Sequence, residues 1–284
     1  MLFNDIINFL GKPYFQTKNC LIYRQNCLEA MAALPERSIN LTLTSPPYNI
    51  GKDYEKTLPL NDYLSWCSLW IEEIYRVTVN NGSFWLNLGY LSIPNRAKAI
   101  PIPYLLWDKI PFYLIQEIVW NYGAGVAGKK FFSPRNEKFL WYVKNQDLYT
   151  FNLDAVRDKN VKYPNQKKNG KIKVNPLGKN PTDVWNFPKV TSGKNRASKE
   201  RTSHPAQFPV AVIERIIEAS SNKNEIILDP FMGSGTTAVA ALGLDRQVIG
   251  FEIREDYCNI AARRIEDFLK PKEINEAQLS LFRV

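Results

Sequence analysis

The chain has 284 residues, of which 45% are hydrophobic and 23% are charged, as in a globular protein with a substantial core. No apolar run approaches the roughly 20 residues that span a bilayer, and Met1 to Lys12 lacks the pattern of a secretion signal. We therefore expect a cytoplasmic protein that does not bind membranes. The four cysteines and the single histidine have no metal-ligand spacing, so we expect no metal site.

The net charge of +9 is concentrated in one segment of the chain. Between Val156 and Arg201 there are thirteen lysines and arginines and three acidic residues, so this window alone carries +10. A polyanion would meet this segment first. The charge favours a nucleic-acid partner, and a solvated lysine-rich loop is the alternative.

Short apolar runs alternate with helical patterns in chain order. We expect strands at 21–24, 39–43, 83–88, 114–120, 138–143, 225–228 and 247–253. We expect helices at 28–34, from a cap at Asn61 onward, and at 208–219, 236–244 and 257–269, the last with Ile260, Ala261, Ile265 and Phe268 on one side. This alternation predicts an α/β fold with a doubly wound, mostly parallel sheet in a single domain over 1–284.

The alternation fails between Asp154 and Ser203, where Asn, Lys, Gly and Pro dominate. A loop of this length inside a compact domain is usually either binding apparatus or disorder. We therefore place an inserted functional region at 155–203. We also expect a flexible C-terminal tail at 271–284.

A rigid turn, Ser45-Pro46-Pro47-Tyr48, follows the strand at 39–43. The two prolines fix the backbone and remove two donors, which leaves carbonyl oxygens free to accept hydrogen bonds. If Ser45 Oγ and the Pro46 carbonyl accept the two hydrogens of a planar amine, its nitrogen shifts toward tetrahedral geometry and can attack a sulfonium methyl. Tyr48 can stack on a base taken out of the duplex. A purely structural turn is the alternative, but a turn at the carboxyl end of a strand favours a site.

A second motif, the segment 229–237, reads as the end of a strand, a glycine turn and the start of a helix. Gly233 and Gly235 allow the backbone to turn tightly and to approach a ligand. Phe231 can lie against an adenine or a ribose, and Glu252, which closes the next strand, can accept ribose hydroxyls. The pattern indicates a nucleoside cofactor, with an NAD site or a structural turn as alternatives. A P-loop is excluded because no Gly-Lys-Ser/Thr follows.

In this order, the two motifs make the chain similar to the bacterial amino-group DNA methyltransferases of the permuted, beta-type arrangement. The resemblance runs from about Cys20 to Leu269. It implies a methyltransferase fold with circularly permuted motifs, S-adenosylmethionine as the cofactor, and a place in a restriction-modification system. It also implies direct attack on a flipped base of double-stranded DNA. By this resemblance the catalytic residues are Ser45, Pro46, Pro47 and Tyr48, and the cofactor-binding residues are Asn26, Thr44, His204, Asp229, Phe231, Gly233, Ser234, Gly235, Thr236, Thr237 and Glu252.

The expected target base is inferred from sequence differences among members of that family. Ser-Pro-Pro-Tyr tends to accompany methylation of cytosine N4, and Asp-Pro-Pro-Tyr that of adenine N6. Ser45 therefore implies N4 of cytosine, and Phe208, where lysine is frequent, favours the same base. Adenine N6 is the alternative, whereas cytosine C5 is disfavoured because no Pro-Cys pair occurs. Gln25-Asn26 stands where relatives often have Gly-Asp, so the match at Asn26 is looser.

Two other classes of enzyme remain open. A methyltransferase of protein glutamine amides would also use a Pro-Pro-Tyr turn, but such enzymes more often have Asn before it. A nicotinamide-dependent oxidoreductase would explain the glycine turn and Glu252. Neither class needs the basic segment.

The basic segment would be the target-recognition region of such an enzyme. We expect Lys167, Lys168, Lys171, Lys173, Lys194 and Arg196 to bind DNA, and we expect Trp185 to be a packing anchor. Gln278 to Phe282 resembles the pentapeptide that docks bacterial proteins on the replication sliding clamp, and an apolar tail packed on its own domain is the alternative. Relatives of this arrangement are often dimers, so a homodimer is a further expectation.

Overall fold

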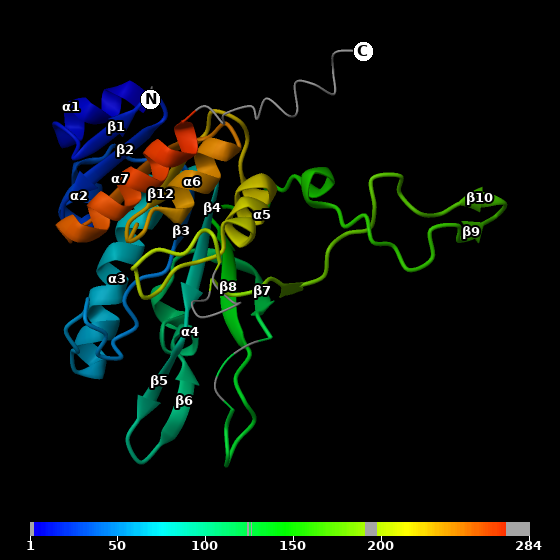
Figure 1. Ribbon diagram of the computed structural model, residues 1–284, viewed down its shortest axis with the longest axis horizontal. Helices are drawn as coiled ribbons and strands as arrows, with labels where there is room; N and C mark the ends of the chain where they lie inside the picture. The colour runs from blue at the N-terminus through cyan, green and yellow to red at the C-terminus, as the bar shows by residue number, and fades with distance from the viewer. Residues whose placement is uncertain (1–2, 124, 126, 191–197, 271–284) are drawn as a thin grey trace.

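The computed structural model describes residues 3–123, 125, 127–190 and 198–270. Its centre is a nine-stranded sheet with the order β1-β2-β13-β12-β3-β4-β8-β7-β11 (Figure 1). All of these strands except β1 and β8 run in one direction. The predicted mostly parallel, doubly wound sheet is confirmed. Within the described ranges, no helix is both long enough and apolar enough to cross a membrane.

The elements have the following bounds. The sheet consists of β1 (Phe15–Thr17), β2 (Cys20–Arg24), β3 (Ile39–Thr44), β4 (Thr78–Leu88), β7 (Tyr113–Asn121), β8 (Asn136–Val143), β11 (Val184–Asn186), β12 (Ile226–Asp229) and β13 (Gln247–Glu252). The helices are α1 (Ile6–Leu10), α2 (Cys27–Ala33), α3 (Leu60–Val77), α4 (Ile102–Leu105), α5 (Val210–Ser220), α6 (Thr236–Gly243) and α7 (Glu255–Leu269), with short 3-10 turns η1 (Phe3–Asp5), η2 (Trp107–Lys109) and η3 (Leu153–Val156). Two small hairpins pair β5 (Tyr90–Ile93) with β6 (Ala97–Pro101) and β9 (Lys167–Lys168) with β10 (Lys171–Ile172).

The sheet is covered on both faces, and this explains its nearly continuous apolar strands. In β2, Leu21 and Tyr23 pack in the cluster that contains α1, α2 and α3, whereas Cys20 and Ile22 pack in the cluster that contains α5, α6 and α7. Side chains alternate between the faces of a strand, so a strand buried on both sides needs apolar residues at successive positions.

Three local predictions differ from the structure. Helix α3 begins at Leu60 after Pro59, so the predicted cap at Asn61 is wrong because this residue lies inside the first turn. Helix α5 begins at Val210 rather than at Phe208. Phe268 is 43% exposed because it lies in the last turn of α7, although Ala261 and Ile265 of the same helix are buried as expected.

The segment without a clear pattern contains three short strands. Residues 157–183 form a basic arm that projects from the body of the molecule and carries the β9–β10 hairpin (Figure 1). Strand β11 follows the arm and extends the main sheet in parallel with β7. Trp185 of β11 is 7% exposed and its ring stacks on Trp85 with 5.9 Å between centroids, so the predicted packing anchor is confirmed. The insertion at 155–203 stays a prediction of domain organisation, and the tail at 271–284 lies outside the described residues.

Candidate active site

One edge of the sheet collects the carboxyl ends of its parallel strands. Strand β3 lies between two halves of the sheet, with β12, β13 and β2 on one side and β4, β8, β7 and β11 on the other. A cavity of about 560 Å³ at this edge is lined by residues from both halves. The Ser45-Pro46-Pro47-Tyr48 turn directly follows β3 and lines the same cavity. The two sequence motifs therefore meet here although they are far apart in the chain.

Ser45 and Tyr48 share one acceptor. The Asn87 Oδ1 atom accepts hydrogen bonds from Ser45 Oγ at 3.2 Å and from the Tyr48 hydroxyl at 2.5 Å, and the two hydroxyl oxygens lie 2.9 Å apart. Asn87 is fully buried, and its Nδ2 donates to the Lys138 carbonyl at 2.9 Å. Since each hydroxyl has one hydrogen, donation to Asn87 leaves the lone pairs of Ser45 Oγ available to an incoming amine.

A hydrogen bond and a close contact hold Pro47 and Tyr48 of the turn in place. The Tyr63 hydroxyl donates to the Pro47 carbonyl at 2.9 Å, whereas among the described residues no hydrogen bond reaches the Pro46 carbonyl. Gly89 leaves room for the Tyr48 ring, because a Cβ atom at Gly89 would lie 2.7 Å from Tyr48 Cε2. Burial raises the pKa of Tyr48 well above its ordinary value, so this phenol stays protonated.

Asp229 organises the start of the cofactor half. Its Oδ1 accepts from Thr44 Oγ1 at 2.8 Å and from the Phe231 amide at 3.2 Å, and its Oδ2 accepts from Thr237 Oγ1 at 2.6 Å. Burial raises the pKa of Asp229 to about 6. Thr44 does not line the cavity, and neither does Gly235, which is the left-handed N-cap of α6. We therefore infer that Thr44 and Gly235 support the loop behind the cavity and do not contact a ligand in it.

Glu252 stands at the end of β13 and faces the glycine turn. Its Oε2 accepts from the Gly233 amide at 3.0 Å, and its Oε1 accepts from the Arg254 amide at 2.9 Å. Burial raises the pKa of Glu252. Each carboxylate oxygen retains a lone pair, as a pair of ribose hydroxyls would require. Phe231 lines the same region with its ring edge-on to Trp66 and Trp70.

His204 closes the cavity against the glycine turn. Its Nδ1 accepts from the Ala206 amide at 3.2 Å, and its ring lies 4.4 Å from that of Tyr257. A Cβ atom at Gly233 would lie 2.8 Å from His204 Nε2, so the turn and the ring fit only with glycine there. Burial, with Arg264 and Arg254 nearby, lowers the pKa of His204 to about 4.

The remaining predicted cofactor residues also lie at this cavity. Asn26 lines it, but its Oδ1 already accepts from the Leu28 amide at 2.9 Å and so caps helix α2. Ser234 and Thr236 line it too, and Arg264 Nη1 holds this pair by donating to the carbonyl of Ser234 at 2.7 Å and to Thr236 Oγ1 at 3.0 Å.

The cofactor half fits an adenosyl group with an amino-acid end. Glu252 provides acceptors for ribose hydroxyls, Phe231 an apolar face for a purine, and Gly233 a backbone without a side chain. Thr236 and Thr237 open helix α6, where amide groups suit a carboxylate.

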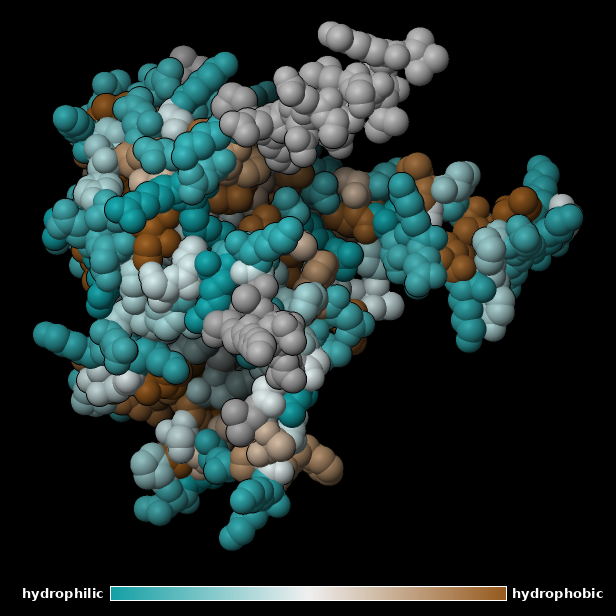
Figure 2. All heavy atoms as spheres, in the orientation of Figure 1, coloured by the Kyte–Doolittle hydropathy of each residue, from teal (hydrophilic) through white to brown (hydrophobic). Residues whose placement is uncertain are grey.

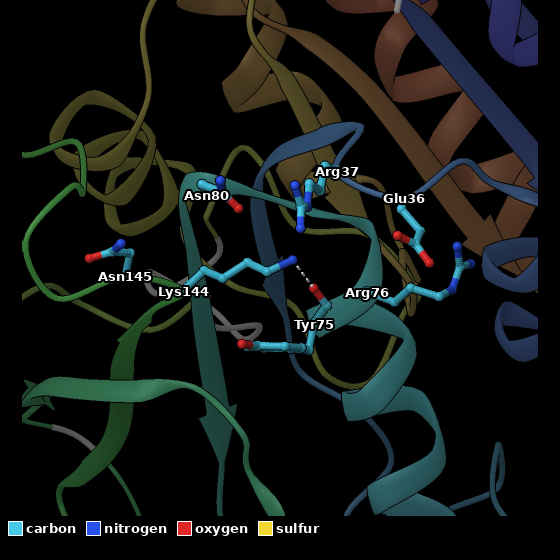
Figure 3. Close-up of a pocket in the computed structure, with 7 residues that line it drawn as sticks. All are labelled: Glu36, Arg37, Tyr75, Arg76, Asn80, Lys144 and Asn145. Atoms are coloured by element: carbon cyan, nitrogen blue, oxygen red, sulfur yellow. Dashed lines mark hydrogen bonds between the residues drawn. The ribbon is translucent and has the colours of Figure 1, made fainter.

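A second cavity, of about 490 Å³, lies elsewhere on the molecule and has a structural explanation (Figure 3). It is lined by Glu36, Arg37, Tyr75, Arg76, Asn80, Lys144 and Asn145. Lys144 Nζ donates to the Tyr75 carbonyl at 2.7 Å and to the Thr78 carbonyl at 2.6 Å. Arg76 donates to the carbonyls of Leu34 and Met31. These two cations satisfy the ends of helices rather than a ligand.

The predicted DNA-binding lysines lie apart from the cavity. Lys167, Lys168, Lys171 and Lys173 are exposed on and beside the β9–β10 hairpin, and Figure 2 shows many hydrophilic residues over the arm. Lys194 and Arg196 lie outside the described residues.

The chain is similar to known DNA methyltransferases. The fold, the Pro-Pro-Tyr turn and the nucleoside site together define a methyltransferase of the permuted type. The family model described as DNA methylase matches residues 39–263. The chain is 62% identical over 262 residues to the Type II methyltransferase M.ScaI of Streptomyces caespitosus, covering 92% of this chain and 86% of the relative. It is 36% identical to M.BglII of Bacillus subtilis over 90% of this chain and 72% of that one. The chain therefore belongs to the DNA methylase family, whose cofactor is S-adenosylmethionine.

Solved structures agree on the fold. The PvuII cytosine-N4-specific DNA methyltransferase superposes with a TM-score of 0.72 at 20% identity, covering 96% of this chain and 94% of that chain. A putative DNA modification methylase of Thermus thermophilus, complexed with S-adenosyl-L-methionine, superposes with a TM-score of 0.60 at 20% identity, covering 88% of this chain and 95% of that chain.

Proposed function

We propose that this DNA methyltransferase modifies the N4 amine of cytosine in double-stranded DNA, as the cytoplasmic modification enzyme of a restriction-modification system. The observation that carries the proposal is the hydrogen bond that Ser45 Oγ donates to Asn87 Oδ1, which leaves Ser45 Oγ able to accept a hydrogen bond from the base. Bound S-adenosylmethionine would supply an electrophilic methyl group: as the N–C bond forms, the S–C bond breaks to leave S-adenosylhomocysteine, and the methylated amine loses one proton. Ser45 Oγ and the Pro46 carbonyl accept the two amine hydrogens, which makes the amine lone pair available for attack.

Other residues of the chain support this chemistry by position. Tyr48 offers its ring to the extruded base and its hydroxyl to Asn87. Glu252 and Phe231 hold the adenosyl group, and Asp229 fixes the loop that carries Phe231. The reaction needs no nucleophilic cysteine, because the amine itself is the nucleophile.

The choice of cytosine over adenine rests on Ser45. Relatives of both kinds exist: the PvuII enzyme is titled cytosine-N4-specific, and YhdJ of Escherichia coli (strain K12), 34% identical over 254 residues, is named a DNA adenine methyltransferase. The Type II relatives M.ScaI and M.BglII support a role in restriction-modification. Membership of the DNA methylase family weighs against a glutamine-amide methyltransferase and against a nicotinamide enzyme.

Transfer of a labelled methyl group from S-adenosylmethionine to unmethylated bacterial DNA tests the activity. We expect the unaltered protein to label DNA and Ser45→Ala to lose about 10- to 100-fold in kcat, as expected when one hydrogen bond to the reacting group is removed. The affinity for S-adenosylmethionine should stay the same. Labelling of added protein instead of DNA would contradict the proposal.

Two expected partners stay predictions. The clamp-docking segment Gln278 to Phe282 lies outside the described residues. The homodimer is expected only because relatives of this arrangement are often dimers.

A further inference from the structure

The active-site cavity extends beyond the cofactor residues into the second half of the sheet. Trp120, Glu137, Lys189 and Val190 line this part. Trp120 on β7 and Glu137 on β8 are directly paired across the two strands. Lys189 follows β11, whose last residue pairs with the last residue of β7. These side chains therefore line the same cavity as the catalytic turn, from strands of the other half of the sheet.

A partly buried cation is held in this region by an acid and an aromatic ring. Lys189 Nζ lies 3.9 Å from Glu137 Oε1 and 3.5 Å from the centroid of the Tyr122 ring. The side chains of Lys189 and Glu137 are only 35% and 25% exposed. Among the contacts of the described residues, the ammonium makes this ion pair and this cation–π contact but donates no hydrogen bond. Its N–H groups are therefore available to a ligand in the cavity.

The acid of this pair stands beside the catalytic turn. Burial raises the pKa of Glu137, whereas the ammonium of Lys189 and the amide of Asn87 lower it. Asn87 is the same residue that accepts from Ser45 and Tyr48. Asn87, the ion pair and the Ser45 turn therefore line the same cavity.

We propose that Lys189, positioned by Glu137 and Tyr122, donates hydrogen bonds to the pairing edge of the extruded base and makes the site prefer cytosine. This inference rests on the proposed function. When Ser45 and Pro46 accept the amine hydrogens, the next atoms on the edge of cytosine are N3 and O2, which are both acceptors. On adenine the corresponding atoms are N1, an acceptor, and a C–H group, which offers none. A cation with several donors therefore stabilises cytosine more than adenine.

Lys189→Met tests this interaction because it keeps the length of the side chain and removes the donors. We expect kcat/KM for DNA to fall about 10- to 100-fold, the usual effect of removing a hydrogen bond to a base edge. The affinity for S-adenosylmethionine and the slope of DNA binding against salt should not change. Lys223→Met is the control: Lys223 also pairs with an acid, Asp245, at 2.7 Å but does not line the cavity, so its kcat/KM should stay within about twofold of the unaltered protein.

Lys189→Arg distinguishes an interaction with the base from one with a phosphate. Arginine keeps the charge but is larger and planar, so a phosphate site would tolerate it and a fitted base site would not. We expect kcat/KM to remain low in this variant. Full activity of Lys189→Arg, together with a reduced salt slope for Lys189→Met, would show that the lysine binds a phosphate. Weakened binding of S-adenosylmethionine by Lys189→Met would show that it binds the cofactor. Either result, or unchanged kcat/KM, would overturn the inference, whereas absence of methyl transfer by the unaltered protein would overturn the proposed function instead.

Discussion

The Ser45 hydroxyl has one hydrogen and two lone pairs, and Asn87 determines how they are used. By accepting the hydrogen, Asn87 Oδ1 keeps Ser45 Oγ as an acceptor. The Asn87 amide is itself fixed because its Nδ2 donates to the Lys138 carbonyl. At the scale of single residues, the site therefore depends on a buried amide that belongs to neither motif in the sequence.

Replacing Asn87 should separate catalysis from cofactor binding. Asn87→Leu has a similar volume but cannot accept from Ser45, so the hydroxyl would be free to rotate. We expect kcat for methyl transfer to fall about 10-fold or more, with the affinity for S-adenosylmethionine unchanged. Asn121→Leu, at an exposed pair with Asn186 on the same edge of the sheet, is the control and should keep its kcat. Equal decreases of kcat in the two variants would refute the special role of Asn87.

His204 should make the protein sensitive to acid. Its pKa is lowered to about 4 by burial, from an ordinary value of 6.5. The unfolded chain therefore binds this proton at higher pH than the folded protein does. The contribution of His204 to the free energy of unfolding is complete above about pH 6.5 and is lost as the pH falls toward 4, by at most about 3 kcal/mol.

Two measurements check this contribution. Because the chain has a single histidine, NMR can follow its ring protons without ambiguity. Urea unfolding gives the decrease in the free energy of unfolding between pH 7 and pH 5. We expect this decrease to be larger for the unaltered protein than for His204→Gln, because all other titrating groups are the same in the two proteins. A ring that titrates near pH 6.5 would contradict the buried, neutral state.

Among the elements, we propose that the basic arm, with its exposed lysines, binds DNA phosphates. Replacing Lys167, Lys168, Lys171 and Lys173 together by alanine should weaken binding and reduce the slope of log K against log salt by about 0.9 for each phosphate that the arm no longer neutralises. Replacing Lys12 and Lys18, which are exposed near the other edge of the sheet, should leave the slope unchanged. An unchanged slope in the arm variant would show that the arm does not bind phosphates.

The sequence predicts those elements whose residues are buried on both faces or on one regular side. Strands β12 and β13 contain short apolar runs, and β3 alternates Ile39, Leu41 and Leu43 with Asn40, Thr42 and Thr44; the predicted positions of all three agree with the structure to within about two residues. Strand β11 has three residues and pairs only at an edge, which is too short for any periodicity. Asn87 could not be predicted from the sequence for a different reason. A single polar residue within a strand gives no periodic signal, and only the hydrogen bonds of the folded protein connect it with Ser45.

At the scale of the whole molecule, the order of the strands explains the order of the motifs. The early strand β2 and the late strands β12 and β13 form the cofactor half, whereas β4, β7, β8 and β11, from the middle of the chain, form the other half. Strand β3 lies between the halves and ends at the Ser45 turn. The chain therefore presents the Ser45-Pro46-Pro47-Tyr48 turn before the glycine turn, although the two line one cavity.

We propose that this cavity delivers the N4 amine of cytosine to the cofactor. The most direct test is to incubate the protein with S-adenosylmethionine and unmethylated bacterial DNA, digest the DNA to nucleosides, and identify the methylated base by mass spectrometry. We predict N4-methylcytosine, at a much lower yield in the Ser45→Ala reaction. N6-methyladenine as the sole product would contradict the assignment of the base and the proposed role of Lys189, while leaving the methyltransferase class in place.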